Sequence, residues 1–208
     1  MQTLVVDHPL VAHKLTMLRE EGTQAPTFRR LSDELVTLLA YEAMREMRVR
    51  PVTVTTPLGP AGGVKLAGPV PLVVPVLRAG IGMLDGMTRL LPTADVGFVG
   101  MVRDEESLVA STYADRLPAD LSGREVFVLD PMLATGNSAV AAVDRLKETR
   151  PRSIRFVCLL AAPEGIKNFQ THHPEVPIYT AAIDDKLNDH GYIVPGLGDA
   201  GDRIFGTK

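Results

Sequence analysis

The stretch VFVLDPMLATGNS, residues 126–138, decides the fold of this 208-residue chain. Four apolar residues lead into Asp130, and the cluster Thr135-Gly136-Asn137-Ser138 then precedes an apolar pattern with helical spacing. An unbroken apolar run is typical of a strand buried on both faces, and the pattern after it indicates a helix packed on the sheet. A strand-to-helix turn needs only one or two small polar residues, so this longer cluster predicts that the turn binds something.

The same alternation of strand and helix continues on both sides of this stretch. We predict strands at residues 70–77, 95–101, 125–130, 154–162 and 176–183, with helices at 80–90, 138–149 and 163–173. An earlier helix is predicted from an N-cap at Thr27, followed by a short strand at 52–55, a turn-rich segment at 57–63 and a polar loop from 103 to about 123. This order predicts an α/β fold in which helices cover both faces of a parallel sheet.

We predict a single domain over residues 1–208, with an N-terminal arm at about 1–50 and a C-terminal hood at about 184–208. The hood has no periodicity but carries more apolar residues than a disordered tail, so we expect an ordered, irregular cap. Asp184, Asp185 and Asp189 are interpreted as an acidic, solvated part of it rather than as a metal cluster.

Composition excludes several classes of function. The net charge of −3 provides no overall basic field for nucleic acid or an anionic membrane. No apolar run approaches the ~20 residues of a membrane span. The N-terminus MQTLVVDHPL lacks the features of a signal peptide, which predicts a cytoplasmic protein. Cys158 is the only cysteine, so an internal disulfide is excluded and the residue is expected to pack in a strand.

The cluster after Asp130 is suited to a phosphate. Ligands of open parallel sheets bind at the carboxyl ends of the strands, and a helix N-terminus offers free N–H groups and a positive dipole end. Thr135 and Ser138 add hydroxyl donors, Gly136 permits a positive φ, and Asp130 could accept hydrogen bonds from hydroxyls of the ligand. No lysine follows the glycine, so the phosphate is predicted to be a terminal monoester. Considered alone, the turn is as compatible with a purely structural role as with a phosphate site. In the structural role, Asp130 ends a strand and Asn-Ser caps a helix.

The complete pattern DPMLATGNS resembles the 5-phosphoribosyl diphosphate loop of the type I phosphoribosyltransferases, with Pro131 where many members carry a second acidic residue. The variant DPMLATG is similar to that of the uracil phosphoribosyltransferase family. Further blocks resemble this family over nearly the whole chain: HPLVAHKLTMLRE (8–20), LLAYEAMRE (38–46), VPVLRAGIGMLDG (74–86), VGMVRDEES (99–107), AAPEGI (161–166) and HGYIVPGLGDAGDRIFGTK (190–208). The last block is the most specific. The chain departs from the family at Val102, where a tyrosine is usual, and at Asn137, where a second glycine is usual.

The resemblance implies the residues of the site. Asp130, Arg78 and Arg103 would be catalytic, although each arginine alone reads as a solvated surface charge. The ribosyl donor would be bound by Arg78, Arg103, Asp130, Pro131, Met132, Leu133, Ala134, Thr135, Gly136, Asn137, Ser138 and Asp199. Uracil would be held by Tyr192, Ile193, Gly198, Asp199 and Ala200 in the hood. The implied cofactor is Mg²⁺, carried by the diphosphate without a direct protein ligand.

The implied reaction transfers a 5-phosphoribosyl group from 5-phosphoribosyl 1-diphosphate to N1 of uracil, giving UMP and diphosphate in pyrimidine salvage. The resemblance also suggests a homo-oligomer and GTP as a candidate activator, although neither can be read from the residues themselves. Two alternatives remain open: transfer to a different base, and a non-catalytic regulator on this fold that binds RNA. A panel of bases would test the first, and a gel shift with pyrimidine leader RNA the second.

Overall fold

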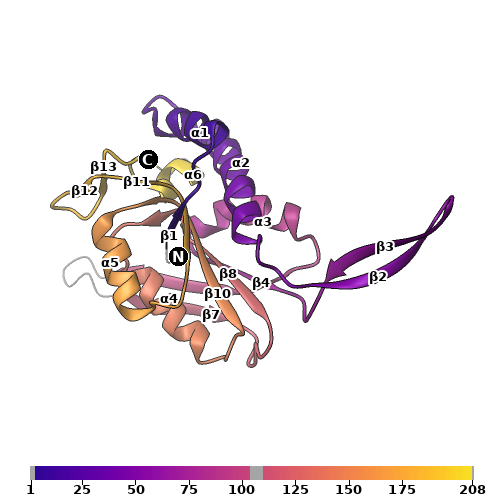
Figure 1. The fold of residues 1–208 in the computed structure, drawn as a ribbon. Helices are drawn as coiled ribbons and strands as arrows, with labels where there is room; N and C mark the ends of the chain where they lie inside the picture. Colours follow the sequence, from indigo (N-terminus) through magenta and orange to yellow (C-terminus); the bar gives the residue numbers. More distant parts are fainter. Residues whose placement is uncertain (1–2, 104–109, 208) are drawn as a thin grey trace.

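The computed structural model describes residues 3–103 and 110–207. For residues 102, 103 and 110–112 it describes the backbone alone. One sheet runs through the molecule in the order β1-β11-β10-β8-β4-β6-β7 (Figure 1). Its strands are β1 (Thr3–Val5), β11 (Ile178–Ile183), β10 (Ser153–Ala161), β8 (Glu125–Leu129), β4 (Leu72–Leu77), β6 (Phe98–Arg103) and β7 (Ala110–Arg116). Short strands β5 (Asp95–Val96) and β9 (Met132–Leu133) pair with β4 and β10. The neighbouring strands pair in parallel up to β6, which confirms the predicted parallel sheet.

Helices cover both faces of this sheet, as predicted. Along β8, Val126 and Val128 face one apolar core, whereas Phe127 and Leu129 face the other. The period of two in a strand produces this division, and burial on both faces explains why β8 reads as an unbroken apolar run. One core lies under α4 (Asn137–Lys147) and α5 (Pro163–His172), and the other under α1 (Pro9–Arg19) and α2 (Ala25–Ala43).

The N-terminal helices belong to the main core. Phe28, Leu31, Leu35 and Leu39 of α2 are fully or almost fully buried at the three- and four-residue spacing of one helix face. The predicted N-cap at Thr27 is wrong by three residues, because the N-cap is Gln24. The helix begins at Ala25 with Pro26 in its first turn, where the missing N–H of proline costs no hydrogen bond.

A long hairpin of β2 (Val49–Thr56) and β3 (Gly59–Leu66) projects from the body (Figure 1). The prediction of a turn-rich segment over 57–63 is therefore wrong, because only Pro57 and Leu58 connect the strands. Thr56 holds this tight turn: its hydroxyl donates to the carbonyl of Gly59 over 2.8 Å and accepts from the amide of Gly59 over 3.2 Å. The glycines that suggested a turn pair across the hairpin with β-branched residues.

Two further segments differ from the sequence prediction. The helix expected at 80–90 begins as a 3₁₀ helix, η1 (Ala79–Met83), and continues as α3 (Leu84–Leu90). The predicted polar loop from 103 to about 123 is wrong in part, because Ala110–Arg116 forms β7, antiparallel to β6. An antiparallel strand at the edge of an otherwise parallel sheet is common in α/β proteins.

The C-terminal hood contains short regular elements joined by turns. Strands β12 (Lys186–Leu187) and β13 (Ile193–Val194) form a small antiparallel pair, and α6 (Ala200–Phe205) follows. Ile193, Leu197, Ala200 and Ile204 bury their side chains in the core beneath α1 and α2. Among the described residues, no helix is long and apolar enough to cross a membrane.

Candidate active site

The ends of β4 and β8 meet at one edge of the sheet. Pro75 is paired with Leu129, so Arg78 and Asp130 follow their strands at neighbouring positions. Close packing requires Gly80 here, because a Cβ would lie 2.4 Å from the carbonyl oxygen of Leu129. The peptide between Leu77 and Arg78 is cis, and the Arg78 side chain is exposed. The structure therefore brings the two predicted strand-end residues to the same edge.

The predicted phosphate loop lies beside them at the start of α4. Gly136 occupies the N-cap position with φ +82°, in the left-handed region that favours glycine. Gly136 has no side chain to cap the helix, and the Asn137 amide donates to the Thr135 hydroxyl over 3.5 Å. The positive dipole end of the helix lies at this loop. The 5-phosphate is predicted to bind at this place.

The first turns of α5 support the loop from behind. A Cβ at Gly165 would lie 2.2 Å from the carbonyl oxygen of Ala134, so only glycine allows the helix to approach this closely. The side-chain amide of Asn168 donates to the carbonyl of Thr135 over 2.8 Å and to Oδ1 of Asn137 over 2.9 Å. The departure from the family at Asn137 therefore provides an acceptor for a side chain on α5. Asn168 carried no signal in the sequence.

Asp130 lies deep at the end of β8. Although its side chain keeps partial exposure, burial raises the pKa of Asp130 to about 7, against a smaller opposing effect from the Met132 amide. That amide donates to Oδ1 of Asp130 over 3.3 Å. A carboxyl with a raised pKa at a strand end is typical of a binding or catalytic site rather than of a surface turn.

A cavity of about 270 Å³ separates the strand ends from the hood. It is lined by Asp130 and the residues after it on one side, and by hood residues on the other: Ala79, Asp130, Pro131, Met132, Ala134, His190, Gly191, Tyr192, Ile193, Gly198, Asp199, Ala200 and Gly201. All five predicted uracil residues belong to this lining. Larger hollows lie elsewhere, including one of about 540 Å³ beside Glu42 and Tyr179, but that one is lined by none of the predicted site residues.

Four lining residues escaped the prediction: Ala79, His190, Gly191 and Gly201. Ala79, Gly191 and Gly201 are direct neighbours of predicted residues and His190 is two positions from Tyr192, so the available signal was proximity in the sequence. Asp199 is exposed and caps α6 by accepting a hydrogen bond from the Asp202 amide over 2.9 Å. Leu133 is buried and does not line the cavity, and Thr135 to Ser138 form the neighbouring loop.

Two residues at the end of β6 are only partly placed. The backbone of Val102 and Arg103 belongs to the strand, but both side chains lie outside the described structure. The polar loop predicted from residue 103 continues with residues 104–109, which also lie outside the described structure.

The interpretation of Asp184 as part of a solvated acidic tail is wrong. The residue is buried and forms a bidentate ion pair with Arg19 of α1, over 2.7 and 2.5 Å. Its partner is 165 positions away, and that separation explains why the local sequence suggested a solvated charge.

Comparison with known proteins agrees with this geometry. The sequence model of the uracil phosphoribosyltransferase family matches residues 5–207. Relatives bearing that name from Kineococcus radiotolerans and Streptomyces avermitilis are 63% and 62% identical, each over 100% of this chain and at least 99% of the relative. A solved structure of a protein from Aquifex aeolicus aligns with a TM-score of 0.93 at 39% identity, over 98% of both chains.

More distant structures share the fold alone. A hypoxanthine-guanine phosphoribosyltransferase from Bacillus anthracis aligns with a TM-score of 0.51 at 16% identity, over 78% of this chain and 83% of its own. The family-model match over residues 5–207 and the full-length relatives establish the relationship. This chain belongs to the uracil phosphoribosyltransferase family.

Proposed function

We propose that the protein transfers the 5-phosphoribosyl group of 5-phosphoribosyl 1-diphosphate to N1 of uracil, releasing UMP and diphosphate. The observation that carries this proposal is the cavity between the Asp130 strand end and the glycine-rich hood, beside a helix N-terminus suited to a phosphate. In the reaction the bond from ribose C1 to the diphosphate oxygen breaks, and a bond from C1 to N1 of the base forms. The strand-end side of the cavity would bind the ribosyl donor, and the hood side would bind uracil.

The loop from Ala134 to Ser138 would bind the 5-phosphate. Its fit comes from the N-terminal dipole end of α4, the positive φ of Gly136 and the hydroxyls of Thr135 and Ser138. Asp130 would accept hydrogen bonds from the ribose 2- and 3-hydroxyls. With a ligand-free pKa of about 7, this carboxyl is ready to ionise once hydroxyl donors and a cationic transition state surround it.

Arg78 and Arg103 would stabilise the diphosphate as it leaves, because a guanidinium presents two parallel donors to phosphate oxygens. The carboxylates of Asp130 and Asp199 both line the cavity, and carboxylates together with substrate phosphates are the usual ligands of Mg²⁺. These residues therefore fit Mg²⁺ carried by the diphosphate, although no group of three or more His, Cys, Asp or Glu among the described residues could hold a metal ion. Bound there, Mg²⁺ would neutralise charge on the leaving group.

Uracil would be recognised by the backbone of the hood. Its two carbonyl oxygens need donors and its N3–H needs an acceptor, which backbone groups of Ile193, Gly198 and Ala200 can supply. A fixed acceptor facing N3 disfavours cytosine, whose N3 is itself an acceptor. The exposed ring of Tyr192 lies at the same cavity. Asp199 would contact the ribosyl donor from the hood side.

The decisive experiment is an assay of UMP formation from radiolabelled uracil, 5-phosphoribosyl 1-diphosphate and Mg²⁺. Hypoxanthine, adenine, cytosine and orotate in place of uracil form the control panel. The proposal is supported if uracil, and none of the other bases, is converted to its nucleotide. Faster conversion of another base would show that the protein is specific for that base. Binding to pyrimidine leader RNA without UMP formation would identify the regulator instead. Added GTP in the same assay tests activation, and cell fractionation tests the predicted cytoplasmic location.

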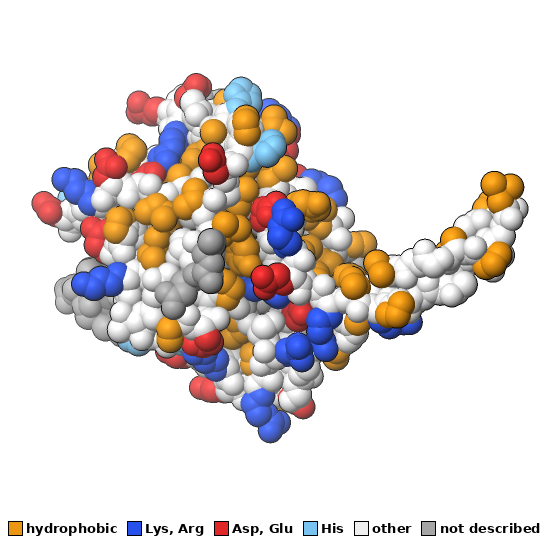
Figure 2. Space-filling model, in the orientation of Figure 1, with side chains coloured by type: hydrophobic (Ala, Val, Ile, Leu, Met, Phe, Trp, Pro, Cys, Tyr) orange, Lys and Arg blue, Asp and Glu red, His pale blue; other side chains and the backbone are white. Residues whose placement is uncertain are grey.

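We also propose that the protein is a homodimer formed through the β2–β3 hairpin. An isolated two-stranded hairpin is marginally stable in water, and this one projects with hydrophobic side chains at its tip and base (Figure 2). Leu58 is 100% exposed and Val64 65%, which is unusual for apolar side chains without a covering partner. A hollow of about 430 Å³ at the hairpin base, lined by Tyr41, Met44, Arg45, Met47, Val49, Leu66, Leu90 and Leu91, offers a surface for the hairpin of a second copy.

The hairpin also carries like charges that no acidic residue of the hairpin offsets. Arg50 lies directly opposite Lys65, and like charges in that position destabilise a strand pair. A two-fold arrangement would cover the exposed hairpin and the largely apolar hollow of each copy at once. Sedimentation analysis should find a wild-type dimer, dissociation in Leu58→Asp/Val64→Thr, and no change in Val96→Thr; a monomeric wild type would refute the proposal.

A further inference from the structure

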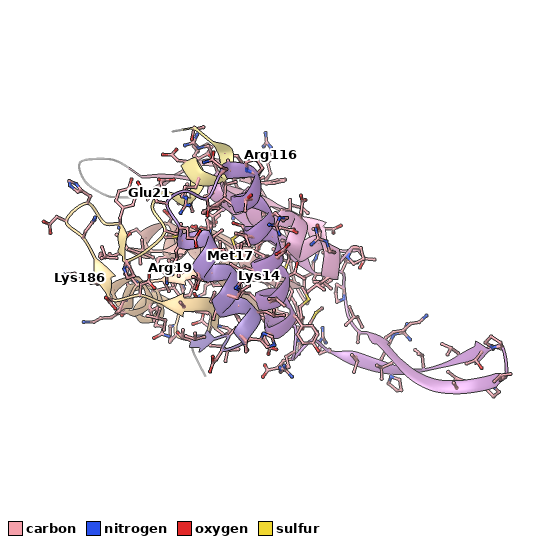
Figure 3. The ribbon with its side chains drawn as sticks, turned by 90° about the horizontal axis from the view of Figure 1, so that it is seen from above. Lys14, Met17, Arg19, Glu21, Arg116 and Lys186 are labelled. Atoms are coloured by element: carbon pink, nitrogen blue, oxygen red, sulfur yellow. The ribbon has the colours of Figure 1, made fainter. Side chains whose placement is uncertain are left out.

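The hood is attached to α1 by an ion pair that also holds a peptide unit of the hood. Arg19, the last residue of α1, contacts both carboxylate oxygens of Asp184, and its Nη1 donates to the carbonyl of Gly196 over 2.8 Å. The amide of Gly196 donates to Oδ2 of Asp184 over 2.8 Å. Figure 3 shows Arg19 on α1 beside the C-terminal segment. Both backbone groups of Gly196 are therefore held by one buried ion pair.

A second guanidinium holds the next residue. Nη1 of Arg203 donates to the carbonyl of Leu197 over 2.8 Å, and its Nη2 donates to the carbonyl of Glu20 over 2.5 Å. The guanidinium also lies over the ring of Phe28, 4.5 Å from its centroid. The carbonyls of Gly196 and Leu197 are thus fixed from the side of the N-terminal helices, directly before the cavity residue Gly198.

This segment needs such support because its backbone is unusual. Gly196 and Gly198 have φ values of +63° and +78°, and a Cβ at Gly196 would lie 2.0 Å from the carbonyl oxygen of Ile193. Residues 195–199 lie between β13 and α6, outside any strand or helix. Glycine in this conformation is also flexible, so other contacts must set the directions of its peptide groups.

We propose that Arg19 and Asp184 are positioning residues for base recognition. They lie outside the cavity lining and set the orientation of the peptide groups that lead into Gly198. The inference rests on the proposed function, because it assigns the backbone of this segment to uracil. A base read by backbone groups is sensitive to their direction, and a displacement of ~1 Å can reduce the rate by about 10²-fold.

Arg19→Lys tests the inference most directly. Lysine keeps a positive charge beside Asp184 but cannot contact both carboxylate oxygens and the Gly196 carbonyl in one plane. We expect the KM for uracil to rise by about 10- to 100-fold, by the displacement argument above. The Kd for 5-phosphoribosyl 1-diphosphate, measured by calorimetry without uracil, should stay within about twofold, since the phosphate loop lies at the start of α4 and is supported by α5 rather than by Arg19.

A double variant separates positioning from stability. Arg19→Met/Asp184→Leu removes both charges together, so it avoids leaving a buried carboxylate without its partner. Its melting temperature should be closer to that of the wild type than that of Arg19→Met, while its KM for uracil stays raised. Arg89→Met is the matched control, because Arg89 of α3 also pairs with both carboxylate oxygens of an aspartate, Asp33 of α2, but on an exposed surface.

The outcomes distinguish the two levels of the argument. If the wild type forms no UMP in the same assay, the proposed function fails. If the wild type forms UMP and the KM for uracil in Arg19→Lys and in the double variant equals that of Arg89→Met, the positioning role is refuted, whatever happens to the melting temperature. A parallel rise in the Kd for the ribosyl donor would also refute it, because the effect would then be general.

Discussion

At Gly165 the backbone of α5 approaches that of the phosphate loop closely. A Cβ placed there would lie 2.2 Å from the carbonyl oxygen of Ala134 and 2.6 Å from that of Leu133. Both obstacles are backbone atoms, so no side chain can rotate away. Gly165→Ala must therefore move the helix or the loop.

The structure sets the size of that movement. Bringing the nearer contact from 2.2 Å to the 3.0 Å that real Cβ atoms require takes a displacement of about 0.8 Å. Overpacking of this kind typically costs about 1–3 kcal/mol of stability. A displacement near 1 Å at a positioning element can reduce the rate by about 10²-fold, so we expect kcat/KM for the ribosyl donor to fall about 10- to 100-fold.

The assay compares steady-state kinetics for each substrate with thermal unfolding. Gly22→Ala is the matched control, because a Cβ at Gly22 meets nothing within 4 Å. We expect the control to match the wild type in both measurements. A folded Gly165→Ala with unchanged kcat/KM for the ribosyl donor would refute the assignment of this loop to the 5-phosphate.

Three further predictions concern residues that the proposal assigns to substrate contacts. Burial raises the pKa of Asp130 from 3.8 to about 7, so the folded, ligand-free protein binds more protons than the unfolded chain in this range and loses stability as the pH rises through it. The melting temperature of Asp130→Asn should therefore exceed that of the wild type by an amount that grows from pH 5 to pH 8. Its kcat/KM should fall ~10²-fold, or about 2.7 kcal/mol. A difference in melting temperature that does not change with pH would contradict the raised pKa. Arg78→Lys should weaken the ribosyl donor and leave the KM for uracil unchanged, and calorimetry showing wild-type donor affinity with wild-type turnover would return Arg78 to a surface role. Gly198→Val should raise the KM for uracil because φ is +78° there, although a Cβ meets only Arg203 Cδ at 3.8 Å, and binding of ribose 5-phosphate should persist.

The buried half of the fold could be predicted because its chemistry is local. Strands such as β8 and β10 are apolar on both faces, so their residues alone identify them, and the helices between them repeat at the expected spacing. The β2–β3 hairpin could not be read in the same way. Its glycines and prolines suggest turns, and the pairing that makes β3 a strand connects residues across a turn whose position no single residue determines.

The residues of the site also fall into those that a local pattern predicts and those that it does not. Asp130 and Gly136 are recognisable because the strand end, the turn and the helix start follow one another within a few residues. Asp184 and Asp185 show the opposite case: they are adjacent and chemically identical, yet only Asp184 is buried and paired with Arg19. The partner lies 165 positions away, at the end of a helix whose packing against the hood depends on the whole fold. A carboxylate in an acidic segment therefore has no local feature that distinguishes a solvated charge from an anchor. What identifies the anchor is the loss of solvent on one face of the hood, and that loss exists only after α1 has packed beneath it.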